Sequence, residues 1–135
     1  MKRILIIDDE SEVRNYLRVA LERAGYQVLE ADNGKTGVKL FRRSPADLVV
    51  TDIFMPEKEG IETIRELRRE FPELKILAVS GGISGLDPEH YLKMAQKLGA
   101  NAVLEKPFHQ NQFIESVREL LASLSHNDTI GEPSS

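Results

Sequence analysis

The chain has 135 residues, which suits one compact domain and is too short for two domains of ordinary size. Hydrophobic residues make up 41% and charged residues 30%, so a core can form and global disorder is not expected. The net charge of -4 argues against direct nucleic-acid binding, and the lack of cysteine excludes disulfides and cysteine nucleophiles. Because no apolar run approaches the roughly 20 residues of a membrane span, we expect a cytoplasmic protein with no membrane contact.

Five short apolar runs alternate with longer segments of helical periodicity. Their length and β-branched content favour strands, and the runs are Arg3–Ile7, Tyr26–Ala31, Asp47–Thr51, Lys75–Val79 and Ala102–Glu105. The first, third and fourth runs are almost continuously apolar, as in parallel strands that helices cover on both faces.

Apolar residues spaced three and four apart predict helices between and after these runs. The predicted helices cover about 13–24, 34–43, 61–71, 91–98 and 113–124, and Gly25 and Gly99 follow two of them. This (βα)₅ order predicts a flavodoxin-like, doubly wound parallel sheet with strand order 2-1-3-4-5 in a three-layer α/β/α arrangement. We expect one domain over 1–124, and residues 125–135 to be a disordered tail or linker remnant.

Polar residues gather where the strands end, and in open α/β sheets ligands bind beyond the carboxyl ends of the strands. The first, third, fourth and fifth runs are followed or closed by Asp8-Asp9, Asp52, Ser80 and Lys106. These four strands are neighbours in the predicted order, so the five side chains should meet at one edge. Asp32, after the edge strand, is expected to lie too far away to join them.

Three carboxylates at one edge need a cation. Two carboxylates about 4 Å apart repel each other by roughly 4 kcal/mol at an effective dielectric constant of about 20. Carboxylate oxygens and water suit Mg²⁺, with Mn²⁺ as a substitute. An aspartate can also accept a phosphoryl group, and an ammonium and a hydroxyl would then stabilise the charge of that group. The sequence therefore predicts that Asp8 and Asp9 hold the metal, beside Lys106 and Ser80.

With these residues in place, the sequence resembles the receiver domain of bacterial response regulators over about residues 2–124. The motifs that carry the resemblance are Leu5–Glu10, Asp52 with Met55-Pro56 and Gly60, Ser80-Gly81, and Lys106-Pro107-Phe108.

The resemblance implies a role for each site residue. Asp52 would be the phosphoacceptor and a metal ligand, Asp9 the main direct Mg²⁺ ligand, and Asp8 a ligand acting largely through water. The backbone carbonyl of Phe54 would complete the protein's metal contacts. Lys106, before a cis proline, would bind the phosphoryl oxygens, and Ser80 would contact the phosphoryl group and carry the switch.

The same resemblance implies partners. A histidine kinase or histidine phosphotransfer protein would supply the phosphoryl group, and an output domain or effector protein would receive the signal. The chain would be an enzyme only in catalysing its own phosphorylation and dephosphorylation. By analogy, the partner surface would be the fourth helix, fifth strand and fifth helix, which also leaves a homodimer open; it includes Lys93, Lys97 and Gln112.

Three features bear on the switch. Val103 stands where relatives often carry an aromatic residue, so we expect the signal to travel through the loop after the fourth strand. That loop, Gly81–Asp87, has three glycines and is longer than the usual pattern. Phe54 is expected to hinder the hydrolytic water and so to lengthen the phosphorylated state.

Two other functions use the same fold. A phosphatase acting through an aspartyl-phosphate would want a second acid two residues after the nucleophile, where this chain has Phe54. A flavin- or nucleotide-binding flavodoxin-like domain would want phosphate-binding glycines after the first strand, where this chain has Asp8 and Asp9. Both alternatives are weaker than the receiver.

Overall fold

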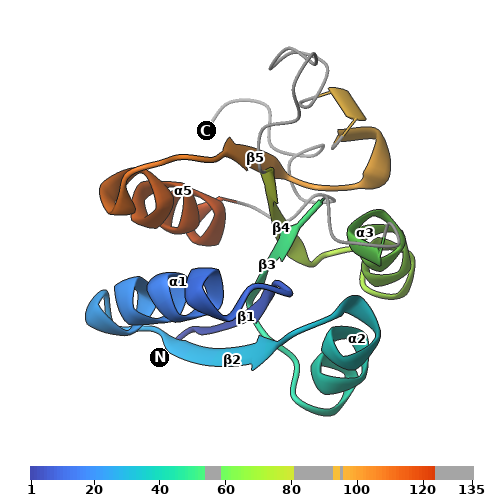
Figure 1. Ribbon diagram of the computed structural model, residues 1–135. Coiled ribbons are helices and arrows are strands. Elements are labelled where there is room, and N and C mark those ends of the chain that lie inside the picture. The colour runs from blue at the N-terminus through green and yellow to red at the C-terminus, as the bar shows by residue number, and fades with distance from the viewer. Residues whose placement is uncertain (54–58, 81–92, 95, 124–135) are drawn as a thin grey trace.

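The computed structural model describes residues 1–53, 59–80, 93–94 and 96–123 of the chain (Figure 1). Within these residues the order of elements is strand and helix in alternation. The elements are β1 (Arg3–Ile7), α1 (Ser11–Arg23), β2 (Gln27–Ala31), α2 (Gly34–Arg43), β3 (Leu48–Asp52), α3 (Glu59–Glu70), β4 (Lys75–Ser80), β5 (Ala102–Glu105) and α5 (Gln110–Ala122). Residues 93–94 and 96–98 are helical, within the helix predicted over 91–98.

The strands form one parallel sheet in the order β2-β1-β3-β4-β5, which confirms the predicted flavodoxin-like topology. Helices α1 and α5 cover one face, and α2 and α3 cover the other (Figure 1). Alternate residues of β1 serve the two layers: Ile4 and Ile6 pack with α1 and α5, whereas Leu5 and Ile7 pack with α2 and α3. The continuously apolar runs are therefore strands that are buried on both faces.

Four predicted strand ends were wrong by one residue: the start of β2, both ends of β3 and the end of β4. The second strand begins at Gln27 because the Tyr26 amide donates to the Leu21 carbonyl and so belongs to the end of α1. The third strand runs to Asp52, whose backbone pairs with Val79. The backbone of Asp52 is thus held by the sheet itself.

Glycines mark the ends of two helices, as predicted. Gly25 and Gly99 both have positive φ, of 96° and 109°, a conformation that glycine adopts without strain. The predicted tail, 125–135, lies outside the described residues, so the boundary at 124 stays a prediction. None of the described helices is long and apolar enough to cross a membrane.

Candidate functional site

Carboxylates from the turn after β1 and from the end of β3 converge at the carboxyl edge of the sheet. Oxygen atoms of Asp8, Asp9, Glu10 and Asp52 all lie within 4.8 Å of one another. Asp8 and Asp52 are only 2% and 5% exposed, whereas Asp9 and Glu10 are open to solvent. The register explains the convergence, because Ile7 and Thr51 are paired and one further residue brings both strands to an aspartate. Glu10 was not predicted to take part; its place directly after Asp9 was the available signal.

Lys106 supplies the positive charge at this edge. Its Nζ lies 3.3 Å from Oδ2 of Asp52 and 3.7 Å from Oδ2 of Asp8. Burial lowers the pKa of Lys106, but the carboxylates of Asp52 and Asp8 outweigh this effect, so the pKa lies above its ordinary value. Lys106 is therefore protonated at neutral pH. The Lys106–Pro107 peptide bond is cis, as expected.

Asp8 is hydrogen-bonded through both its side chain and its backbone. Its Oδ1 accepts the Glu10 amide at 2.9 Å, and its own amide donates to the Ala31 carbonyl at 3.1 Å. Burial raises the pKa of Asp8 more than the Glu10 amide and the Lys106 ammonium lower it, and the charge of Asp52 adds to the rise. The ionised form of Asp8 is therefore stabilised less than it would be in water, and a bound cation would relieve this.

The start of α3 packs directly on the end of β3. A Cβ atom on Gly60 would clash with the backbone carbonyl of Asp52 and lie 2.5 Å from the carbonyl of Ile53. Only glycine fits this approach without movement of the backbone that carries Asp52. Gly60, one of the motif residues, thus has a structural reason for its place.

The remaining predicted residues are only partly visible. Ser80 ends β4 opposite Glu105, which places its backbone beside the strand that leads to Lys106. The Ser80 side chain, Phe54 and the Gly81–Asp87 loop lie outside what the structure describes. Val103 is half-buried against the core layer of α2 and α3. Asp32 is absent from the described carboxylate cluster, in agreement with the prediction.

The residues of the predicted partner surface differ from one another. Lys93 and Lys97 are exposed. The Gln112 side chain accepts the His109 amide at 3.2 Å in a capping box at the start of α5. Gln112 therefore stabilises the helix terminus, although it is exposed like the two lysines.

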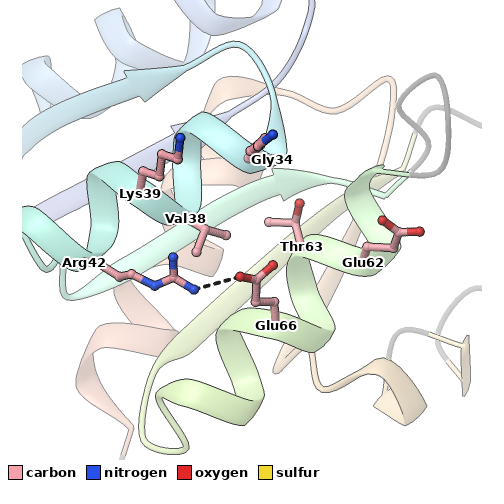
Figure 2. A pocket seen from close by; sticks show the side chains of 8 residues that line it. Gly34, Val38, Lys39, Arg42, Glu62, Thr63 and Glu66 are labelled. Carbon is pink, nitrogen blue, oxygen red and sulfur yellow. Dashed lines mark hydrogen bonds and ion pairs between the residues drawn. The ribbon is translucent and has the colours of Figure 1, made fainter.

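A groove of about 370 Å³ lies elsewhere, between α2 and α3 (Figure 2). Arg42 crosses from α2 to Glu66 of α3 at 2.8 Å and also pairs with Glu70. The groove is lined by Gly34, Lys35, Val38, Lys39, Arg42, Glu62, Thr63 and Glu66. None of these residues belongs to the carboxylate cluster, which is a site on the sheet edge and not part of this groove.

The donor set of the cluster fits a hard divalent cation. It consists of carboxylate oxygens only, two of them buried and two open to water, and Mg²⁺ is commonly bound by a few carboxylates together with water. The sheet edge is thus an acidic cluster able to hold a metal ion beside a lysine and an aspartate.

Comparison with known proteins decides the family. The model of the response regulator receiver domain matches residues 4–118. The chain belongs to the response regulator receiver family. It is a phosphorylation-activated signalling receiver, and the phosphatase and flavodoxin alternatives are not favoured.

Relatives of this receiver fall into two lengths. It is 37% identical to the response regulator receiver protein CpdR of Brucella abortus, over 90% of this chain and 98% of that one. It is 33% identical to the chemotaxis protein CheY of Thermotoga maritima, over 88% and 97%. It spans only 48% of the regulatory protein PhoP of Bacillus subtilis, at 32% identity over 89% of this chain.

Solved structures of response regulators have the same fold as this receiver. A receiver domain from Methanospirillum hungatei superposes with a TM-score of 0.80 at 28% identity, covering 90% of this receiver and 94% of that chain. A response regulator from Chloroflexus aurantiacus gives 0.81 at 27% identity, over 90% and 98%.

Proposed function

We propose that Asp52 accepts a phosphoryl group in a reaction that needs Mg²⁺. The observation that supports this most is the contact of the buried Asp52 carboxylate with Lys106, next to the acidic pair Asp8 and Asp9. Asp8, Asp9, Asp52 and the backbone carbonyl of Phe54 would hold the ion, and Mn²⁺ would substitute for it. When bound, the ion would neutralise charge on the transferred phosphoryl oxygens.

The chain's own groups account for the rest of the reaction. A carboxylate oxygen of Asp52 forms the new bond to phosphorus while the bond from phosphorus to the donor, a histidine nitrogen or the acyl oxygen of a small phosphodonor, breaks. The ammonium of Lys106 then pairs with the phosphoryl oxygens instead of with the free carboxylate. Ser80, at the end of β4, would hydrogen-bond the same group and carry the change to partner surfaces.

The donor would be a histidine kinase or a histidine phosphotransfer protein, and the receiver of the signal an output domain or an effector protein. The lengths of the relatives support both arrangements, since CpdR and CheY are about the length of this chain and PhoP is about twice as long. The domain would cover residues 1–124, and residues 125–135 would be a tail or linker. The protein would be cytoplasmic. The fourth helix, β5 and α5 would form the partner or dimer surface, without contact to nucleic acid or membrane.

The test is phosphorylation by acetyl phosphate with Mg²⁺. The parent protein should gain one alkali-labile phosphoryl group, seen by intact-mass spectrometry, and Asp52→Asn should gain none. Asp32→Asn, which removes an aspartate outside the cluster, is the matched control and should react like the parent. An adduct on Asp52→Asn, or turnover of phosphate esters by the parent, would contradict the proposal.

The phosphorylated lifetime tests Phe54 separately. If the aromatic ring hinders the hydrolytic water, Phe54→Asn should lose its phosphoryl group faster than the parent after the donor is removed. Equal or slower loss would count against this role of Phe54 and leave Asp52 as the acceptor.

A further inference from the structure

Arg14 of α1 reaches back to the turn that carries the acidic pair. Its Nη1 donates to the backbone carbonyl of Asp8 at 2.7 Å. Its Nε lies 3.4 Å from Oε1 of Glu30 on β2, and the Arg14 side chain is 19% exposed. One guanidinium thus connects the edge strand to the backbone of a proposed metal ligand, and its planar, many-donor geometry suits this double contact.

The backbone of Asp8 is held at its amide by β2 and at its carbonyl by Arg14 of α1. Its amide donates to the Ala31 carbonyl at 3.1 Å, and its carbonyl accepts from Arg14, which Glu30 fixes in turn. Glu30 and Ala31 are consecutive residues of β2. The edge strand therefore supports the acidic turn although its own aspartate, Asp32, lies outside the described cluster.

We propose that Arg14, oriented by Glu30, is a positioning residue for the metal site: it fixes the backbone of Asp8 so that the carboxylates of Asp8 and Asp9 stay aimed at the ion. This inference rests on the proposed function, because it assumes that the carboxylate cluster binds Mg²⁺. Groups that orient metal ligands without touching the metal commonly change metal affinity by 10- to 100-fold when removed.

Charge and geometry predict opposite results when Arg14 is removed. A guanidinium near a cation site repels the cation, so the loss of its charge alone would tighten Mg²⁺ binding. Loss of its hydrogen bond to Asp8 frees the turn, and the carboxylates must then be ordered when the ion binds, which weakens binding. If a variant that lacks the Arg14 charge binds Mg²⁺ more weakly than the parent, the lost hydrogen bond to Asp8 outweighs the lost repulsion, and Arg14 has a positioning role.

The experiment compares Arg14→Met with Arg18→Met by Mg²⁺ titration in a calorimeter. Arg18 also pairs with Glu30, at 3.2 Å, but its remaining contacts, Glu22 and Asn15, lie on α1. We expect the Mg²⁺ dissociation constant to rise about tenfold in Arg14→Met. It should change by less than about twofold in Arg18→Met, because exposed ion pairs contribute little. Backbone amide signals of Asp8 and Asp9 in metal-free protein should move only in Arg14→Met.

Two further variants keep the inference testable if Arg14→Met folds poorly. Arg14→Lys keeps the charge but can bridge Asp8 and Glu30 less well, so its affinity should lie between those of the parent and Arg14→Met. Glu30→Gln keeps the size of the side chain and weakens the hold on Arg14, so a smaller loss is expected.

The outcomes separate the two proposals. If the parent binds Mg²⁺ and the Arg14 variants bind it equally well or more tightly, the positioning role is wrong and the proposed function stands. If the parent does not bind Mg²⁺ at all, the metal site itself is wrong and the positioning role falls with it. If Arg18→Met weakens binding as much as Arg14→Met, the effect is general and not due to the contact with Asp8.

Discussion

Buried charge is handled differently at the two ends of the sheet. At the carboxyl edge, the buried carboxylates of Asp8 and Asp52 share the Lys106 ammonium. At the other end, Lys75 begins β4 and is only 8% exposed. Its Nζ donates to the carbonyls of Leu120 and Ser123 at 3.1 and 2.7 Å and to the Ser123 hydroxyl at 2.6 Å.

The difference separates a structural charge from a functional one. The carbonyls at the end of a helix carry partial negative charge and need donors, so the end of α5 and the Lys75 ammonium satisfy each other. Among the described residues of the carboxyl edge, four clustered carboxylates meet the ammonium of Lys106, and burial raises the pKa of Asp8. Charge in excess of its local partners is what a cation-binding site requires.

The largest effect on stability is expected when the contacts of Lys75 with the end of α5 are removed. Lys75→Met keeps an apolar stem of similar length but removes the charged donor to the Ser123 carbonyl and hydroxyl and to the Leu120 carbonyl, which keeps only its contact with Ser123. The free energy of unfolding should therefore fall by about 3 kcal/mol. Urea denaturation measures this. The gain in stability that saturating Mg²⁺ gives should be the same as in the parent. A variant as stable as the parent would show that water replaces the ammonium at no cost.

At the carboxyl edge, Lys106→Met should destabilise the metal-free protein by about 2 kcal/mol, because Asp8 and Asp52 lose their compensating charge. Saturating Mg²⁺ should return most of that loss, since a bound cation can replace the ammonium. Urea denaturation with Mg²⁺ and with a chelator separates the two states. If Mg²⁺ stabilises this variant no more than it stabilises the parent, the ammonium and the ion do not share the same carboxylates.

Sequence reasoning predicted the convergence at the carboxyl edge because that follows from topology. Asp8 follows β1, Asp52 ends β3 and Lys106 follows β5, and all three strands are parallel members of one sheet, so the strand order brings these residues together. The contacts of Lys75 and Arg14 could not be predicted in the same way. They depend on which direction a long side chain takes between elements far apart in the chain, and neither spacing nor periodicity specifies that.

A smaller effect, of opposite sign, is expected for Asp8→Asn. Removing one charge from the cluster should stabilise the metal-free protein by about 1 kcal/mol, the scale of a typical single substitution. The Asn side-chain oxygen can still accept the Glu10 amide, so the turn should keep its shape. Thermal melts should show a rise in melting temperature without metal and a reduced response to Mg²⁺. A melting temperature no higher than that of the parent would mean that the carboxylates do not repel one another as their proximity implies.

The smallest expected effect is the pH dependence of the stability that Asp8→Asn adds to the metal-free protein. Burial raises the pKa of Asp8 in the folded, metal-free protein above its ordinary value of 3.8. The folded state therefore binds the proton more tightly than the unfolded state, and protonation of Asp8 stabilises the fold. As pH falls from about 7 through the folded-state pKa toward about 4, the parent should recover stability that Asp8→Asn already has, and the gap between the two should close. Urea denaturation of both proteins along this pH series measures the gap directly, and titration of groups common to both cancels. If the difference in unfolding free energy between the two proteins widens as pH falls, the fold stabilises the ionised form of Asp8. Asp8 would then be a charge that its local contacts stabilise, as Lys75 is.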